Sequence, residues 1–203
     1  MKVALIGASG NIGGQILTEL LSRGHEVTAV ARNVGKVAAQ PGVTPARGDL
    51  SDPAGLAAVL RGHDAIVSSV RFRMFRPEQM LDAVKASGVK RFIMVGGAGS
   101  LEVSPGVALI DTPEFPAAAK EEATAGAVML AALRKENDLA WSFLSPSAVI
   151  GPGERTGKFR LGGDQLLVGS DGKSRIAIPD FAIALVDELE QRQHIRRRFT
   201  VGY

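Results

Sequence analysis

Three glycines near the start of the chain have the spacing of a loop that binds phosphate groups. Gly7, Gly10 and Gly13 follow an apolar run at residues 3–6 and precede an amphipathic helical pattern. In such a loop the first glycine permits a tight turn, the second lets the backbone approach a pyrophosphate, and the third allows close helix–strand packing. Free N–H groups at the helix N-terminus favour phosphate binding. The alternative is an ordinary glycine-rich turn. The residues predicted to contact a dinucleotide here are Gly7, Ser9, Gly10, Asn11 and Ile12.

The end of the second predicted strand bears on which dinucleotide would bind. An NAD site usually has an acidic residue here for the ribose 2′-hydroxyl, but Arg32 and Asn33 follow residues 27–31. Arg32 is suited to hold a 2′-phosphate through paired N–H donors, with Lys36 assisting. The alternative is an arginine that stacks on adenine without selecting the cofactor. We therefore expect NADPH or NADP, with NADH also possible.

Further cofactor contacts are expected where later strands end. Asp49 and Leu50 follow a third short strand and are predicted to border the adenine. Asp49 is an equally good candidate to cap the helix that follows Asp52 and Pro53. The other predicted contacts are Ser68, Ser69, Val70, Gly96, Gly97, Lys120, Pro146 and Ser147.

The elements that must position these residues alternate between strand and helix patterns. Strands are predicted at residues 3–6, 27–31, 65–69, 92–95, 141–144 and 199–202. Helices are predicted at 11–22, 53–60, 77–86 and 118–135, with a last helix that begins at Pro179 and is capped by Asp180. Such alternation predicts an α/β fold of Rossmann type, a doubly wound parallel sheet with helices on both faces.

Two long stretches interrupt this alternation. They are rich in glycine and proline and lie near residues 97–117 and 151–175. We expect both to be insertions on the substrate side of a single NAD(P)-binding domain, residues 1–203, and the second to form a small hairpin or lid. Loops of this length either cover a ligand or cover a sheet edge, and the sequence favours neither.

The composition limits the other classes of function. The 203 residues carry a net charge of +3, contain no cysteine, and hold three scattered histidines, so we expect no metal site. The short basic run at residues 196–198 has no accompanying motif, so no nucleic-acid partner is expected. No apolar run is long enough to span a bilayer and no signal-peptide pattern opens the chain, which predicts a cytoplasmic protein without a membrane partner.

Five motifs carry a resemblance to a known group. They are GASGNIG at 7–13, VGGAGSL at 95–101, FLSP at 143–146, GPGERTG at 151–157 and RFTVGY at 198–203. Over nearly its whole length the chain resembles atypical short-chain dehydrogenase/reductases, in particular proposed NADH-flavin reductases, flavin/biliverdin-IXβ reductases and NmrA-like proteins. The resemblance implies an NADP-binding fold and reduction of flavins or quinones.

The catalytic residues of ordinary members of this superfamily are not in place. Those enzymes use a serine, a lysine and a tyrosine four residues before the lysine, with the tyrosine as proton donor. Here Pro116 stands four residues before Lys120, and the usual serine position falls on Gly97. The sole tyrosine is Tyr203. The catalytic residues are therefore unknown, and Lys120 and Ser100 are the remaining candidates.

The segment after the fourth strand is unusually short and mixes aromatic and basic residues. Phe72, Met74 and Phe75 would form an apolar wall for a flat acceptor, and the arginines would attract an anionic one. The favoured alternative is that the aromatics pack under the first insertion and the arginines face water. The arginines are Arg71, Arg73 and Arg76.

These observations favour two functions. The leading hypothesis is an NADPH-dependent oxidoreductase that passes hydride to a flavin, a quinone or a similar flat acceptor without a Ser-Tyr-Lys set. The alternative is a non-catalytic NADP(H)-binding sensor or regulator of the NmrA-like type. An isomerase or epimerase is disfavoured because that chemistry normally needs the missing tyrosine. The expected partner is a small-molecule acceptor, and the sequence leaves the oligomeric state open.

Overall fold

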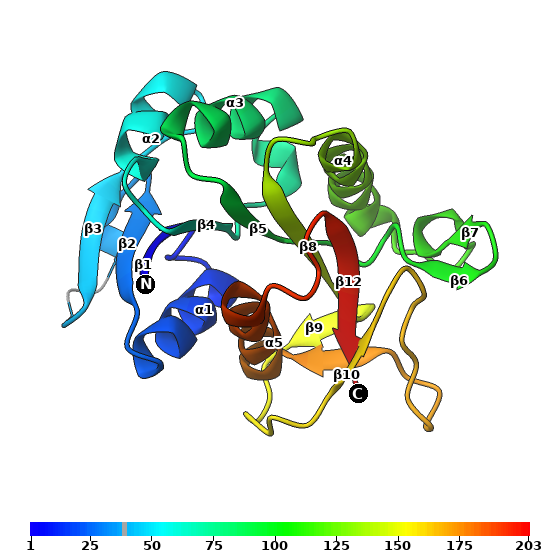
Figure 1. Ribbon diagram of the computed structural model, residues 1–203. Helices are drawn as coiled ribbons and strands as arrows, with labels where there is room; N and C mark the ends of the chain where they lie inside the picture. Colours follow the sequence, from blue (N-terminus) through cyan, green and yellow to red (C-terminus); the bar gives the residue numbers. More distant parts are fainter. Residues whose placement is uncertain (38–39) are drawn as a thin grey trace.

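An eight-stranded sheet forms the centre of the computed structural model, which describes residues 1–37 and 40–203 (Figure 1). The strands lie in the order β10-β12-β8-β5-β4-β1-β2-β3, and only β10 runs antiparallel to its neighbour. They are β1 (Lys2–Ile6), β2 (Glu26–Ala31), β3 (Val43–Arg47), β4 (Ala65–Ser68), β5 (Arg91–Val95), β8 (Ala140–Pro146), β10 (Arg160–Gly162) and β12 (Arg197–Gly202). The chain adds β2 and β3 on one side of β1 and then continues with β4 on the other side of β1. This order confirms the doubly wound Rossmann-type fold.

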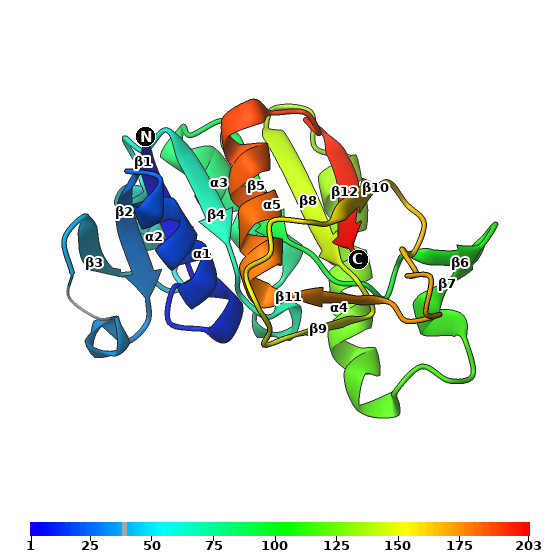
Figure 2. The ribbon, with the colours of Figure 1, turned by 90° about the horizontal axis from the view of Figure 1, so that it is seen from below.

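Helices cover both faces of this sheet. Figure 2 shows α1 (Asn11–Ser22) and α5 (Ile178–Gln191) side by side on one face. Helices α2 (Pro53–Leu60), α3 (Pro77–Ser87) and α4 (Ala117–Arg134) cover the other face (Figure 1). No helix within the described ranges has both the length and the apolar character needed to cross a membrane.

The strands are apolar on both sides because each contributes to two cores. On β5, Ile93 packs towards α1 and α5, whereas Phe92 and Met94 pack towards α2, α3 and α4. Strand β8 follows the same alternation and buries Trp141. Side chains of successive strand residues point to opposite faces, so a strand covered on both faces reads as a nearly continuous apolar run.

The first insertion folds into short elements beside α4. It contains β6 (Glu102–Ser104) and β7 (Val107–Ala108), an antiparallel pair, followed by the 3₁₀ helix η3 (Leu109–Asp111). In Figure 1 this pair projects from the body of the molecule beyond α4. The hairpin of this protein therefore lies in the first insertion.

The second insertion does not form the hairpin that the sequence predicts. Strand β9 (Val149–Gly151) pairs in parallel with β11 (Arg175–Ala177), and β10 pairs antiparallel with β12. The prediction was wrong because each strand pairs with a segment that is distant in the chain, and turn residues indicate only pairing between neighbouring segments. As a result β10 is the last strand at one edge of the main sheet. Strands β9 and β11 lie across the start of α5 (Figure 2).

A buried ion pair joins β5 to α5 through the core. The guanidinium of Arg91 donates to Glu188 Oε1 at 2.8 Å, and both side chains are almost completely buried. Burial lowers the pKa of Arg91, and the charge of Glu188 opposes that shift. Ser142 of β8 also donates to Glu188. Such a pair fixes the register of α5 on the sheet, because either charge alone would be costly to bury.

Candidate functional site

A cavity of about 350 Å³ opens beside the glycine loop, at the carboxyl ends of β1 and β2. We call it the glycine-loop cavity. It brings together many of the predicted cofactor contacts: Gly7, Ser9, Gly10, Arg32, Asn33, Asp49, Leu50, Ser69 and Val70. Lys36, the predicted helper of Arg32, also lines it. Ligands of open α/β sheets bind at this edge, so the cavity is the candidate nucleotide site.

The glycine loop has the geometry that its spacing predicts. Gly7 has a φ of +88°, which L side chains rarely adopt. A Cβ on Gly13 would lie 2.1 Å from the carbonyl oxygen of Gly7, so α1 packs directly against the loop. A Cβ on Gly10 would meet nothing closer than 3.5 Å. Gly7 and Gly13 therefore shape the loop, while Gly10 leaves space on the cavity side.

Charged groups in the cavity are mainly basic. Among the described residues, Arg32, Lys36 and Arg71 line it together with a single acidic residue, Asp49. The Ser51 N–H donates to Asp49 at 2.9 Å, and this bond, with Arg32 and Arg47 nearby, lowers the pKa of Asp49. The excess of positive charge suits an anionic ligand.

The two alternatives for Asp49 are now distinguished by geometry. Asp52, and not Asp49, caps α2, because its carboxylate accepts the Gly55 N–H at 3.0 Å. Asn33 has a similar local role, since its side chain accepts the Gly35 N–H and starts the 3₁₀ helix η1 (Val34–Lys36). This bond fixes the turn after β2, and Arg32 and Lys36 of that turn line the cavity.

The remaining predicted contacts do not line this cavity. Ser68 is buried and its hydroxyl has no hydrogen-bond partner among the residues that the structure describes, whereas Ser147 donates to the carbonyl of Val201. Lys120 is exposed near the start of α4. Ser100 is half-buried, and its hydroxyl accepts a long 3.4 Å bond from Arg198. The others outside the cavity are Asn11, Ile12, Gly96, Gly97 and Pro146.

The position expected for a catalytic serine faces an aromatic ring. A Cβ on Gly97 would lie 3.7 Å from the ring of Phe72, which is buried and stacks on Phe143 at 6.0 Å. The packing alternative for this segment is therefore correct for Phe72, and Arg71, Arg73 and Arg76 are exposed. Met74 lines the glycine-loop cavity together with Arg71, and its contact with an acceptor stays a prediction.

The sole tyrosine takes part in a hydrogen-bond cluster around the buried Asp180. Tyr203 donates to Asp180 Oδ2 at 2.8 Å, and Asp180 also accepts the backbone N–H groups of Thr156 and Gly157. Burial, together with the bond to Asp180, raises the pKa of Tyr203. A catalytic tyrosine needs the opposite shift, so the surroundings of Tyr203 do not favour proton donation.

The cluster also corrects the expected role of Asp180. The residue lies inside the first turn of α5, whose N-cap position is Ala177, and its carboxylate points to the second insertion instead of capping the helix. Burial alone would raise the pKa of Asp180, but the bonds from Thr156, Gly157 and Tyr203 outweigh it and lower the pKa. Asp180 therefore holds the loop that follows β9.

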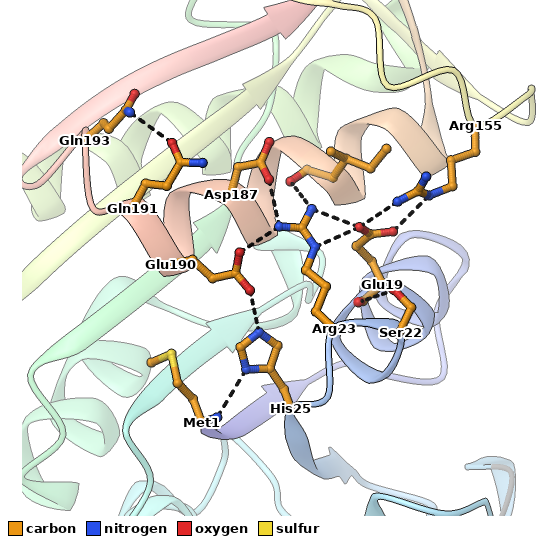
Figure 3. Close-up of polar contacts among 11 residues, drawn as sticks. Met1, Glu19, Ser22, Arg23, His25, Arg155, Asp187, Glu190, Gln191 and Gln193 are labelled. Atoms are coloured by element: carbon orange, nitrogen blue, oxygen red, sulfur yellow. Dashed lines mark hydrogen bonds and ion pairs between the residues drawn. The ribbon is translucent and has the colours of Figure 1, made fainter.

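This loop, residues 152–158, forms a strap that is also attached to α1. Figure 3 shows Arg155 of the strap beside Glu19, with a 3.0 Å ion pair between them. Glu19 also pairs with Arg23, which reaches Glu190 of α5, and Glu190 contacts His25 at 2.9 Å. The strap is therefore bonded both to α1, through Glu19, and to α5, through Asp180.

The strap borders a second, open cavity of about 610 Å³ beside β9 and β11. Pro152, Gly153 and Lys158 line one side, and Ile176, Ala177 and Tyr203 line another. Sequence reasoning missed this cavity and the partners of Glu19, because they come from segments that are far apart in the chain. Only the concentration of glycine and proline in GPGERTG signals a special loop here.

We predict that Gly13→Ala destabilises the fold whereas Gly10→Ala does not. The added methyl at position 13 would overlap the Gly7 carbonyl oxygen, and overpacking of this kind costs about 1–3 kcal/mol. Position 10 has space for a methyl group. Urea unfolding of both variants measures the difference, and equal free energies of unfolding would contradict the close approach.

The second prediction concerns Asp180 and pH. Its lowered pKa means that it stabilises the folded state above its unfolded pKa, near 4, and that this stability is lost as the pH falls through the folded value. Asp180→Asn should therefore be clearly less stable than the original chain at pH 7, with the gap narrowing towards pH 2.5. Urea unfolding across this range tests it, with the exposed Asp82→Asn as control. A gap independent of pH would refute the role of the carboxylate charge.

The chain is similar in sequence and in structure to several known proteins. The chain is similar to the uncharacterized protein YwnB of Bacillus subtilis (strain 168), with 38% identity over 209 residues, 99% of this chain and 98% of that protein. It is also similar to the solved structure of a proposed epimerase from Bacteroides thetaiotaomicron, with 40% identity, a TM-score of 0.94, and coverage of 100% of this chain and 96% of that one.

A third similarity is to a proposed NADH-flavin reductase from Streptococcus pneumoniae TIGR4. Identity is 36% and the TM-score is 0.84, with 100% of this chain and 99% of that chain covered. The sequence pattern of the NAD(P)H-binding family matches residues 7–189, from the glycine loop to the last turns of α5. The resemblance seen in the motifs is thereby confirmed, and the chain belongs to the NAD(P)H-binding family.

Proposed function

We propose that this protein is an NADPH-dependent oxidoreductase that passes hydride to a flavin, a quinone or a similar flat acceptor. The observation that carries the proposal is the content of the glycine-loop cavity. Arg32 and Lys36 line the same cavity as Gly7 and Gly10. A glycine loop suited to a pyrophosphate and basic groups suited to a 2′-phosphate therefore line one cavity, which supports NADPH as the cofactor.

The residues of the cavity fit this cofactor. Gly10 leaves open space where a pyrophosphate would approach the backbone, and α1 begins with N–H groups free of side-chain caps. Leu50 and Val70 add apolar surface for an adenine ring. No carboxylate follows β2 to compete with a 2′-phosphate, since the next residues are Arg32 and Asn33.

The chemistry that fits the protein needs little help from a protein acid. Bound NADPH would supply a hydride from its nicotinamide ring. Tyr203 is engaged with Asp180, and Gly97 has no hydroxyl to orient a carbonyl. A flavin or quinone suits this site because its reduced form is a stabilised, mildly acidic product, and catalysis then depends on proximity. The similarity to a proposed NADH-flavin reductase supports this acceptor class.

The second candidate is an NADP(H)-binding sensor without turnover. The same two observations favour it, because Gly97 has no hydroxyl and the hydroxyl of Tyr203 is bonded to Asp180. The two candidates share the cofactor site and differ only in whether an acceptor reacts there.

We predict NADPH consumption when FMN or menadione is supplied to the purified protein. Gly10→Trp is the control, because an indole on the open side of Gly10 would fill the cavity with little strain on the fold. Turnover should be lost in this variant while its melting temperature stays close to that of the original chain. NADPH binding without turnover would reject the reductase and favour the sensor.

The preference for NADPH is predicted to depend on Arg32. Removal of a charged, paired hydrogen bond costs about 1.5–3 kcal/mol, so Arg32→Ala should raise the Kd for NADPH roughly tenfold or more and leave that for NADH nearly unchanged. Arg47→Ala is the matched control, since Arg47 ends β3 and does not line the cavity. Equal losses for the two dinucleotides would mean that Arg32 does not recognise the 2′-phosphate.

A further inference from the structure

The 3₁₀ helix η2 (Phe72–Met74) follows β4 and turns two side chains towards the glycine-loop cavity. Arg71, its N-cap residue, and Met74, its last residue, both line that cavity beside Gly48 and Leu50. Arg71 is exposed, and 49% of Met74 is exposed although it is a large apolar side chain. Two exposed side chains at the mouth of a cavity are in position to contact whatever enters it.

A carboxylate of α4 holds the backbone of η2. Glu122, in α4, accepts the N–H of Phe72 at 2.7 Å through Oε1 and the N–H of Arg73 at 3.3 Å through Oε2. These are two of the N–H groups at the start of a helical turn, which otherwise lack partners within the turn. One side chain thus fixes the position of the whole short helix.

The ring of Phe72 provides a second anchor. A Cβ on Gly126, one turn after Glu122 in α4, would lie 3.0 Å from this ring, so the ring rests against bare helix backbone. Phe72 also stacks on Phe143 of β8. The segment is therefore attached to α4 by its backbone and by its buried side chain, and Arg71 and Met74 are presented from a fixed support.

We propose that η2 forms the adenosine-side wall of the cofactor site, with Arg71 contacting a cofactor phosphate and Met74 covering the adenine, and that Glu122 is the positioning residue that holds this wall. A thioether is a polarisable group that packs well against an aromatic face. Arg71 adds a third cation to Arg32 and Lys36, which suits a ligand with several phosphate charges. The proposal rests on the NADP-binding part of the proposed function and is independent of turnover.

The direction in which the Kd changes when Glu122 is replaced distinguishes this proposal from a purely electrostatic effect. Removing a negative charge near an anionic ligand should strengthen binding, or leave it unchanged in salt. Glu122→Ala should instead weaken binding, because the support of Arg71 and Met74 is lost. Glu121→Ala is the matched control: Glu121 is the neighbouring residue of α4, its side chain is 78% exposed, and its nearest cation, Arg73, is 3.9 Å away.

The experiment measures the Kd of 2′,5′-ADP, a ligand limited to the adenosine half of the cofactor, by isothermal titration calorimetry. We expect Glu122→Ala to raise this Kd about tenfold, the size of one charged hydrogen bond. Glu121→Ala should bind as tightly as the original chain or more tightly. Glu122→Gln keeps one acceptor oxygen for the Phe72 N–H and should recover most of the affinity. Met74→Ala and Arg71→Ala should each weaken binding with no change in melting temperature.

Amide hydrogen exchange of the unliganded protein provides a readout that does not depend on the ligand. Exchange at residues 72–74 should accelerate in Glu122→Ala and not in Glu121→Ala. Faster exchange with an unchanged Kd would overturn the proposal, since η2 would be anchored but would not form part of the site. Failure of the original chain to bind 2′,5′-ADP would reject both the site and the proposed function. Binding without turnover would reject only the oxidoreductase and leave this inference intact.

Discussion

The close approach of α1 to the glycine loop is the constraint on which the rest of the structure depends. With 2.1 Å between a would-be Cβ of Gly13 and the oxygen of Gly7, no other residue fits at position 13 without movement of the backbone. The helix therefore starts directly at the end of β1, with its free N–H groups towards the cavity. Its position then determines where α5 packs, and α5 in turn carries Glu188 to Arg91 and Asp180 to the strap.

Local patterns made the central fold predictable. The apolar runs, the glycine spacing and the order of strands and helices are all encoded within short windows, so β1, β2 and β5 and the helices α1, α2 and α3 lie where expected. Much of the cavity follows from the same rule, because parallel strands end at one edge of the sheet. Arg32, Asp49 and Val70 meet there although they lie far apart in the chain.

Features that depend on distant partners could not be predicted in this way. Asp180 looks like a helix cap in sequence, yet its partners are 23 and 24 residues away, at Tyr203 and Thr156. The strands of the second insertion likewise pair outside the local window. The position of Met74 beside the glycine-loop cavity could not be predicted either, because the support of η2 by Glu122, 50 residues from Phe72, leaves no trace in the local sequence.

The two edges of the main sheet limit how copies of this chain can associate. At one edge β3 contains Pro45, which has no N–H to offer a further strand. At the other edge β10 is only three residues long. Short edge strands and edge prolines are features that prevent sheets from joining edge to edge. The folded protein should thus resist edge-to-edge growth of its main sheet at high concentration.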